Sequence, residues 1–178
     1  MDIELGAMRV RKVFESDGAV PMLMALPGVT ADDMRALKRW YWSAELSEDP
    51  AEAMFALSIH SYVLQVDGMT ILIDSCNGND KERSVPFANR LKTPYLDRLH
   101  ALGLRPEDID LVMCTHLHCD HVGWNTRLEN GRWVPTFPNA RHIFTRRDYE
   151  AYSRENAEAL HRQGFIDSVL PVVEAGLC

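Results

Sequence analysis

The chain has 178 residues, of which 46% are hydrophobic and 25% charged, the proportions of an ordinary globular domain and not of a fibrous or disordered chain. The formal net charge is −7. Nucleic-acid-binding proteins gain most of their affinity from basic surfaces, so this charge disfavours a nuclease or any other nucleic-acid partner.

The N-terminal residues lack the basic and then apolar pattern of a secretory signal, and no apolar stretch is long enough to cross a bilayer. The four cysteines are scattered without a C-x-x-C spacing, which argues against a zinc ribbon or a thioredoxin-type site: Cys76, Cys114, Cys119 and Cys178. We therefore expect a cytoplasmic protein with reduced thiols and no membrane partner.

A helix is predicted near the N-terminus. Thr30 and Asp33 form a helix-opening capping pair, and the apolar spacing that follows favours a helix over Asp32–Trp42. The aromatic residues Trp40, Tyr41 and Trp42 end it. A helix end packed on the core explains them better than a substrate pocket does, although the pocket stays open as an alternative.

Two β-rich runs, 59–66 and 70–73, flank Asp67-Gly68 and predict a hairpin. The second run is apolar on both faces, so we expect it inside a sheet that is covered on both sides. It ends in the polar loop 74–80.

Strands and helices alternate in the rest of the chain, which indicates a layered α/β fold. Seven further features are expected in chain order: a helix at 95–102, a helical turn at Pro106, a buried strand at 111–114, a hairpin at Asn130-Gly131, a strand at 141–145, and helices at 146–163 and 165–175. The last helix would present an apolar stripe made of Ile166, Val169, Leu170 and Val173.

The run from Thr115 to His121 carries the chemistry. His116 and His118 are separated by one residue at the end of a strand, so alternation places both imidazoles on one side, where they can bind one metal ion. Asp120 and His121 are adjacent, so the chain must turn and present them to a second position. Imidazole and carboxylate ligands suit Zn²⁺, Mn²⁺ or Fe at a hydrolytic centre, and two such ions can share one water-derived nucleophile.

A lone histidine pair is more often structural than metal-binding, but Asp120 and His121 directly behind the pair favour a metal site. For four other histidines we expect structural or surface roles: His60, His100, His142 and His161. Cys119 should point away from the metal, and Cys76 and Cys114 are expected to be small core residues.

The stretch HLHCDH resembles the HxHxDH signature of the metallo-β-lactamase superfamily. The resemblance runs from about Ser58 to Val173 and includes the strand that ends at Asp74. It implies an α/β fold of the αββα sandwich type, with 1–178 as a single domain. Residues 1–57 would be an N-terminal extension with strands and a helix, and 58–178 the half that carries the motif.

The resemblance also implies roles for individual residues. His116 and His118 would hold one metal, while Asp120 and His121 would hold the other. Asp120 would also act catalytically by guiding the proton of the attacking water. Asp74 would steady the metal loop from behind. Trp124 and Asn125 would be pocket walls, and the cofactors would be two divalent ions, zinc in the first place, with manganese or iron as alternatives.

Residues 77–81 and 122–125 are most similar to the lactonase-like and organophosphate-hydrolase-like branch. This implies hydrolysis of a small-molecule lactone or ester by a metal-bound hydroxide. True β-lactamases commonly have Arg where this chain has His121, and glyoxalase II enzymes have a second glycine where it has Trp124. Antibiotic and thioester hydrolysis are therefore less favoured alternatives.

Full-length members of this family contribute a further histidine, a bridging aspartate and a final histidine from downstream. After the motif this chain has only His142 and His161, neither in a Gly-His-Thr setting. We therefore expect the N-terminal half of the sandwich, truncated on its C-terminal side, with an exposed apolar sheet face. Three explanations stay open: an incomplete sequence, a second chain (such as a homodimer partner) that completes the fold, or a non-catalytic metal-binding remnant.

Overall fold

The computed structural model describes residues 2–38 and 47–178, which form two compact units. The larger unit comprises the chain up to Ser16 together with Ile59–Cys178, and the smaller comprises Asp17–Ser58. The predicted aromatic cluster Trp40-Tyr41-Trp42 lies outside the described residues.

The smaller unit contains two short helices, α1 (Met22–Ala25) and α2 (Ala31–Leu37). Thr30 caps α2 as expected: its hydroxyl accepts the Asp33 N–H at 3.3 Å, and the Asp33 carboxylate accepts the Thr30 N–H at 2.9 Å. Met22 and Met34 form a small core with Ala53. The helix predicted from Asp32 is thus present from Ala31 to Leu37, with Lys38 as its C-cap, and positions 39–42 of its predicted range lie outside the described residues.

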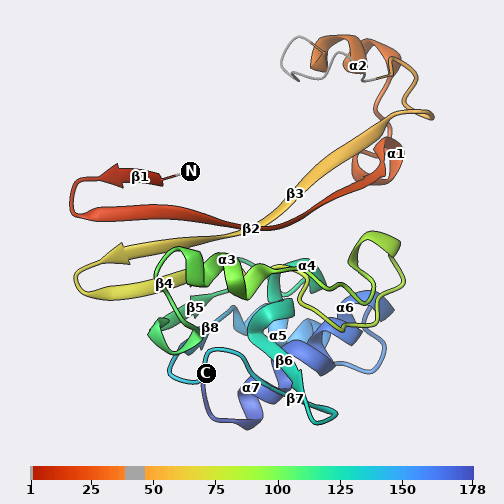
Figure 1. Cartoon of the computed structure of the whole chain (residues 1–178). Helices are drawn as coiled ribbons and strands as arrows, with labels where there is room; N and C mark the ends of the chain where they lie inside the picture. Colours follow the sequence, from red (N-terminus) through yellow and green to blue (C-terminus); the bar gives the residue numbers. More distant parts are fainter. Residues whose placement is uncertain (1, 39–46) are drawn as a thin grey trace. The chain divides into compact units, whose positions relative to one another are not determined.

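The main sheet has six strands in the order β1-β2-β3-β4-β5-β8 (Figure 1). Their bounds are β1 Asp2–Leu5, β2 Met8–Pro21, β3 Met54–Val66, β4 Met69–Ile73, β5 Leu111–Met113 and β8 Arg141–Ile143. β4 is antiparallel to β3 and parallel to β5, which in turn is parallel to β8. The predicted hairpin is confirmed: Asp67 and Gly68, at φ +51° and +78°, form the turn between β3 and β4.

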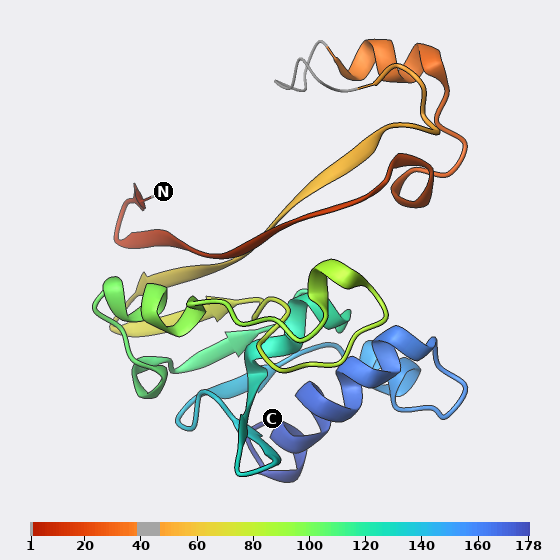
Figure 2. The same cartoon turned by 45° about the vertical axis from the view of Figure 1, so that its right-hand side comes forward.

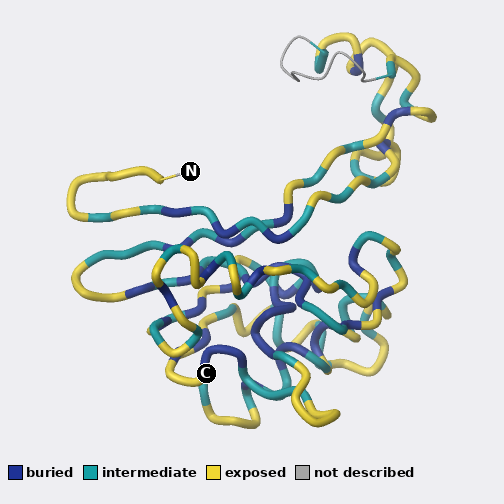
Figure 3. Tube along the Cα trace, viewed as in Figure 1, coloured by how far each residue is buried: buried dark blue, intermediate teal, exposed yellow. Residues whose placement is uncertain are grey.

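One face of this sheet is covered. Val63, Leu72 and Val112 share that face by register and are fully buried. The helix α3 (Tyr95–Ala101) lies against it, because the Tyr95 hydroxyl hydrogen-bonds that of Ser61 on β3 at 2.6 Å. Buried residues follow these strands and the loops behind them (Figure 3).

The opposite face is open. Ile73, Met113 and Ile143 are register partners there, and Met113 and Ile143 remain 37% and 44% exposed. The expectation that β4 is covered on both faces was therefore wrong for the described residues, whereas the expected exposed apolar face is present. An apolar sheet face of this kind normally packs on another layer.

The connections in the larger unit are short helical turns and one small hairpin: η1 Pro86–Ala88, η2 Pro106–Asp108, α4 Cys119–Val122, η3 Gly123–Asn125, β6 Thr126–Glu129 and β7 Arg132–Pro135. β6 and β7 pair around Asn130-Gly131, as predicted. None of the described helices has the length and apolar character that a bilayer crossing requires.

The C-terminal helices differ from their predicted ranges. The helix expected over 146–163 is broken into α5 (Arg146–Tyr152), capped by Thr145, and α6 (Ala159–Gly164), whose start is fixed by the Glu158 carboxylate accepting the His161 N–H at 3.2 Å (Figure 2).

The final helical segment, predicted at 165–175, consists of the π-helical η4 (Phe165–Val169) followed by α7 (Leu170–Glu174). A π turn shifts the helical phase, so the predicted stripe is altered. Phe165 and Val172 are buried together with Val169, while Ile166 is 48% exposed.

Candidate metal centre

The predicted metal-binding run begins where β5 ends. Beyond Met113 the chain leaves the strand, but its side chains keep alternating. Leu117 and Cys119 are buried, whereas His116 and His118, which alternate with them along the chain, are partly exposed. The alternation expected from the sequence therefore persists through the loop and presents both imidazoles on the accessible side.

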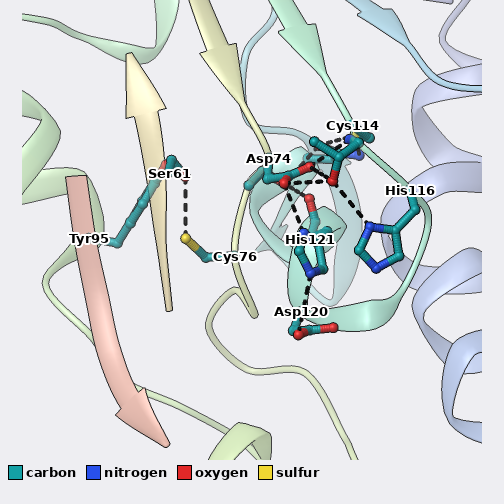
Figure 4. A network of polar contacts seen from close by, with 11 residues as sticks. Ser61, Asp74, Cys76, Tyr95, Cys114, His116, Asp120 and His121 are labelled. Atoms are coloured by element: carbon teal, nitrogen blue, oxygen red, sulfur yellow. Dashed lines mark hydrogen bonds and ion pairs between the residues drawn. The ribbon is translucent and has the colours of Figure 1, made fainter. Parts of the chain in front are cut away.

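The imidazole rings of three of the four predicted ligands lie close together. The ring centroids of His116 and His118 are 4.5 Å apart, and those of His116 and His121 are 3.9 Å apart. Asp120 joins them from the first turn of α4, with its Oδ2 3.5 Å from Nε2 of His121 (Figure 4). Residues of both predicted metal positions thus meet at the end of β5.

Asp74 supports this cluster from the end of β4. Its Oδ2 accepts a hydrogen bond from Nδ1 of His121 at 2.8 Å, and its Oδ1 accepts the Thr115 N–H at 2.7 Å. Asp74 has φ +56°, a left-handed conformation that Asp tolerates better than most residues. The strained turn directs the carboxylate into the loop that carries the histidines.

Thr115 extends the support to a second imidazole. Its Oγ1 donates to Oδ2 of Asp74 at 2.8 Å and lies 3.1 Å from Nδ1 of His116. Because the single hydroxyl proton points to the carboxylate, Oγ1 accepts from a protonated Nδ1 of His116. His116 and His121 are therefore both held as Nδ1–H tautomers, which leaves Nε2 of each ring as its potential metal ligand; Nε2 of His121 lies 3.5 Å from Oδ2 of Asp120.

The protonation equilibria of the histidines differ. Burial, followed by neighbouring imidazoles, lowers the pKa of His116 and of His118, which favours the neutral, metal-binding form. Burial also acts to lower the pKa of His121, but its hydrogen bond to Asp74 and the nearby carboxylates outweigh this and raise it. For Asp74, burial acts to raise the pKa, and the hydrogen bonds from His121 and Thr115 bring it below its ordinary value.

The loops after β4 and around α4 are joined backbone to backbone. The Ser75 N–H donates to the carbonyl of His121, and the Gly123 N–H donates to the carbonyl of Cys76, both at 2.7 Å. A Cβ atom on Gly123 would lie 1.8 Å from the carbonyl oxygen of Asn77, so only glycine permits this approach.

The expected pocket residues Trp124 and Asn125 are internal. Trp124 stacks on Tyr95 with centroids 5.2 Å apart, and its Nε1 donates to the Glu15 carboxylate at 2.6 Å. Asn125 is fully buried and accepts from the Ser75 hydroxyl at 2.8 Å. Contrary to the expectation of pocket walls, both side chains brace the loops from inside.

His161 was expected to have only a structural or surface role, but it contacts the candidate centre. Its ring stacks on that of His118 with centroids 3.8 Å apart and planes within 6°. Tyr152 meets both rings edge-on, at 5.9 Å from His118 and 5.6 Å from His161. His161 follows the break between α5 and α6, and no spacing relative to the motif could have identified it.

The remaining histidines and cysteines differ in their burial. His142 is buried in β8, where burial lowers its pKa to about 4, and His100 is exposed on α3. Burial raises the pKa of Cys119 to about 11, and its side chain is 3% exposed. Cys76 and Cys114 are buried as expected.

The donor types fit a zinc-like ion: imidazole nitrogens with free Nε2 atoms, and a carboxylate. Over residues 2–38 and 47–178, however, no three His, Cys, Asp or Glu side chains converge closely enough to hold an ion. The described residues therefore fit a divalent metal in kind but form a partial site, to which at least one more donor has to be added.

The chain is similar to one family model and to several known proteins. A family model described as the metallo-beta-lactamase superfamily matches residues 54–175. N-acyl homoserine lactonase AiiB of Agrobacterium fabrum (strain C58 / ATCC 33970) is 32% identical over 80 residues, which are 38% of this chain and 28% of that protein. N-acyl homoserine lactonase AttM of Azorhizobium caulinodans is 43% identical over 53 residues, 30% of this chain and 17% of that protein.

Solved structures share the fold. The hydrolase AbOPH, of the beta lactamase superfamily, aligns with a TM-score of 0.71 and 20% identity over 99% of this chain and 58% of that chain. The dizinc quorum-quenching lactonase AidC aligns with a TM-score of 0.66 and 18% identity over 89% of this chain and 48% of that one. The chain thus spans about half the length of these structures, and its sheet and helices match part of their α/β fold.

Proposed function

The chain belongs to the metallo-beta-lactamase superfamily, and from this premise we propose that it carries one half of the metal site of a hydrolase that opens lactones or related esters. The observation that carries the proposal is the cluster of three imidazoles with two tautomers fixed from Asp74. Tautomers fixed in this way are typical of imidazoles that bind a metal through Nε2.

In the proposed site His116 and His118 hold one divalent ion, and Asp120 and His121 hold a second. Zinc is the ion we expect first, with manganese and iron as alternatives. When bound, such ions bring the pKa of water close to neutrality and so supply the nucleophile. Since the described residues form a partial site, further donors are proposed to come from a more C-terminal segment of a longer protein or from another chain.

The residues of this chain have distinct tasks in that reaction. Asp74 fixes the ring of His121 directly and that of His116 through Thr115, so neither imidazole has to reorient when it binds. Asp120 lies 3.5 Å from Nε2 of His121. In the proposed reaction its carboxylate accepts the proton released by the attacking water.

A small neutral ester is the substrate class that fits best. The relatives AiiB and AttM are named N-acyl homoserine lactonases, and the stretches around Asn77–Lys81 and Val122–Asn125 first suggested the same branch. The net charge of −7 gives no support for a nucleic-acid substrate. Phosphotriester, thioester and β-lactam hydrolysis are the competing chemistries that a substrate panel would separate.

A second candidate function is metal binding without turnover, or service as one half of an assembly such as a homodimer. It is favoured by the open sheet face with Met113 and Ile143 exposed, and by the lack of a three-donor site among the residues that the structure describes. A partner that covered this face and supplied the remaining donors would satisfy both features.

The proposal is tested by metal analysis and turnover on the same preparation. Metal per chain would be measured by inductively coupled plasma mass spectrometry, and hydrolysis of an N-acyl homoserine lactone, an aryl ester, a thioester, a β-lactam and a phosphotriester would follow. Asp120→Asn should abolish lactone hydrolysis, whereas Asp97→Asn on the exposed side of α3 should not. Bound metal without turnover would favour the second candidate. Absence of bound metal would contradict metal binding by this chain alone, and the first candidate would then be decided on a protein that supplies the remaining donors.

A further inference from the structure

Glu15, on β2, is a buried carboxylate that the proposed mechanism does not use. It is 2% exposed, and its side-chain partners among the described residues are neutral donors: three N–H groups, and the Thr93 hydroxyl at 3.5 Å from Oε1. Oε2 accepts the Asn77 N–H at 2.8 Å, while Oε1 accepts the Gly78 N–H at 3.1 Å and the Trp124 indole N–H at 2.6 Å. One side chain thus holds two loops that are far apart in the sequence.

Burying an ionised carboxylate is costly unless several donors compensate for the lost water. Burial raises the pKa of Glu15, and the hydrogen bonds from Asn77, Trp124 and Gly78 oppose that shift. An apolar side chain would fill the same space without this cost. What the carboxylate adds is a common acceptor for the three N–H groups, which fixes their relative positions.

Those three groups lie next to the metal loop. Asn77 and Gly78 follow the segment that begins at Asp74, and Trp124 is three positions beyond His121. Gly78 and Asn77 also touch Gly123, since a Cβ on Gly123 would overlap the Asn77 carbonyl. The Ser75 N–H then bonds the His121 carbonyl at 2.7 Å.

We propose that Glu15 is a positioning residue for the metal centre, which fixes from β2 the distance between the loop of Asp74 and the loop of His121. The inference rests on the proposed function, because the centre that it positions is the metal site of that function. It adds a requirement that the HxHxDH run does not contain: the ligand loop needs a carboxylate from an N-terminal strand.

Two variants test this. Glu15→Gln, which is near-isosteric, replaces one carboxylate oxygen by an NH₂ group, so at least one N–H faces another donor. Trp124→Phe keeps an aromatic ring against Tyr95, removes the indole N–H and makes the side chain smaller. Glu4→Gln, on an exposed position of β1, is the matched control. The full chain is used throughout.

The first readout is hydrogen exchange in metal-free protein. If Glu15 fixes the two loops, exchange of the Ser75 and Gly78 amides should accelerate at least about tenfold in Glu15→Gln and in Trp124→Phe, but not in Glu4→Gln. Unchanged exchange in Glu15→Gln would overturn the proposal. Should Glu15→Gln fail to fold, Trp124→Phe decides by the same criterion.

The second readout is Co²⁺, whose visible absorption reports the arrangement of its ligands. Co²⁺ affinity should fall about 10- to 100-fold in each single variant, the range seen when groups that orient metal ligands are removed. The double variant should lose less than the product of the two, because both act on the same carboxylate. If the wild-type chain did not bind Co²⁺, metal binding by this half-site alone would be refuted, while the exchange experiment would still decide the role of Glu15.

Discussion

Nδ1 of His121 donates a 2.8 Å hydrogen bond to Oδ2 of Asp74, which joins the loop after β4 to the first turn of α4. The bond selects one tautomer of His121 and leaves Nε2 on the side of Asp120. It also accounts for the direction of both pKa shifts, since the ion pair favours the charged forms of the two partners.

Replacing Asp74 by Asn tests this relationship. Asn adopts positive φ as readily as Asp, so the turn at φ +56° should survive, but the amide can no longer accept from both His121 and Thr115 in the same way. We expect Zn²⁺ affinity to fall about 10- to 100-fold, measured by competition with a chromophoric chelator. Asp67→Asn in the exposed hairpin is the control, and equal affinities in the two variants would contradict the role of Asp74.

The stack between His118 and His161 leads to a second prediction. Removing the second ring in His161→Ala should free His118 to change rotamer and weaken Zn²⁺ binding, whereas His161→Phe should preserve the stack and most of the affinity. Isothermal titration of Zn²⁺ into each variant measures this. A loss in His161→Phe as large as in His161→Ala would mean that a ring nitrogen, and not the stack, is needed.

Gly123→Ala should be strongly destabilising. The added methyl would lie 1.8 Å from the Asn77 carbonyl oxygen. The atoms that it would meet belong to the backbone, so they cannot move aside as a flexible side chain could. We expect a loss of about 3 kcal/mol or more in the free energy of unfolding, measured with urea. Gly164→Ala, whose Cβ would lie 3.0 Å from that of Cys119, should change stability by no more than about 1 kcal/mol. Similar losses in both variants would refute the argument from close approach.

The buried amine of Lys81 should make the free energy of unfolding depend on pH. Its Nζ is buried between the Thr126 hydroxyl at 2.6 Å and the ring of Trp133, 3.5 Å from its centroid, and burial lowers its pKa from 10.5 to about 7. Between these values the unfolded chain binds a proton that the folded chain does not. Stability should therefore rise with pH across this window, by at most about 1.4 kcal/mol per pH unit.

Lys81→Met keeps the length of the side chain and removes the titrating group. Urea unfolding at pH 7.5 and pH 9.5 should show a smaller rise in stability in the variant than in the wild type. If the two proteins changed in parallel over this range, another group would be responsible for the pH dependence.

The parts that sequence reasoning predicted well are those that short-range chemistry decides. Asp67-Gly68 and Asn130-Gly131 mark hairpins because few residue pairs accept two successive positive φ angles. Thr30 with Asp33 marks a helix start because the two side chains bond each other's backbone. His116 to His121 were identifiable because the predicted ligands occupy one short run after a buried strand.

The remaining features depend on contacts between distant parts of the chain. Glu15 and His161 meet the centre through β2 and α6, and no local pattern links either to the motif. Trp124 was placed in a pocket because it adjoins the motif, yet its indole N–H finds a buried carboxylate from another strand. The break near Glu158 and the π turn at Phe165 arise from local hydrogen bonding that apolar periodicity does not register.

All four cysteines of the sequence lie within the described residues, and they differ sharply in accessibility. Cys178 is exposed, whereas Cys76, Cys114 and Cys119 are buried. A thiol reagent should therefore label this chain first at Cys178. Cys76 and Cys119 lie in the two segments that meet at His121. The slower rate at which the reagent labels these two thiols would measure how often the segments separate, and so how often the centre opens.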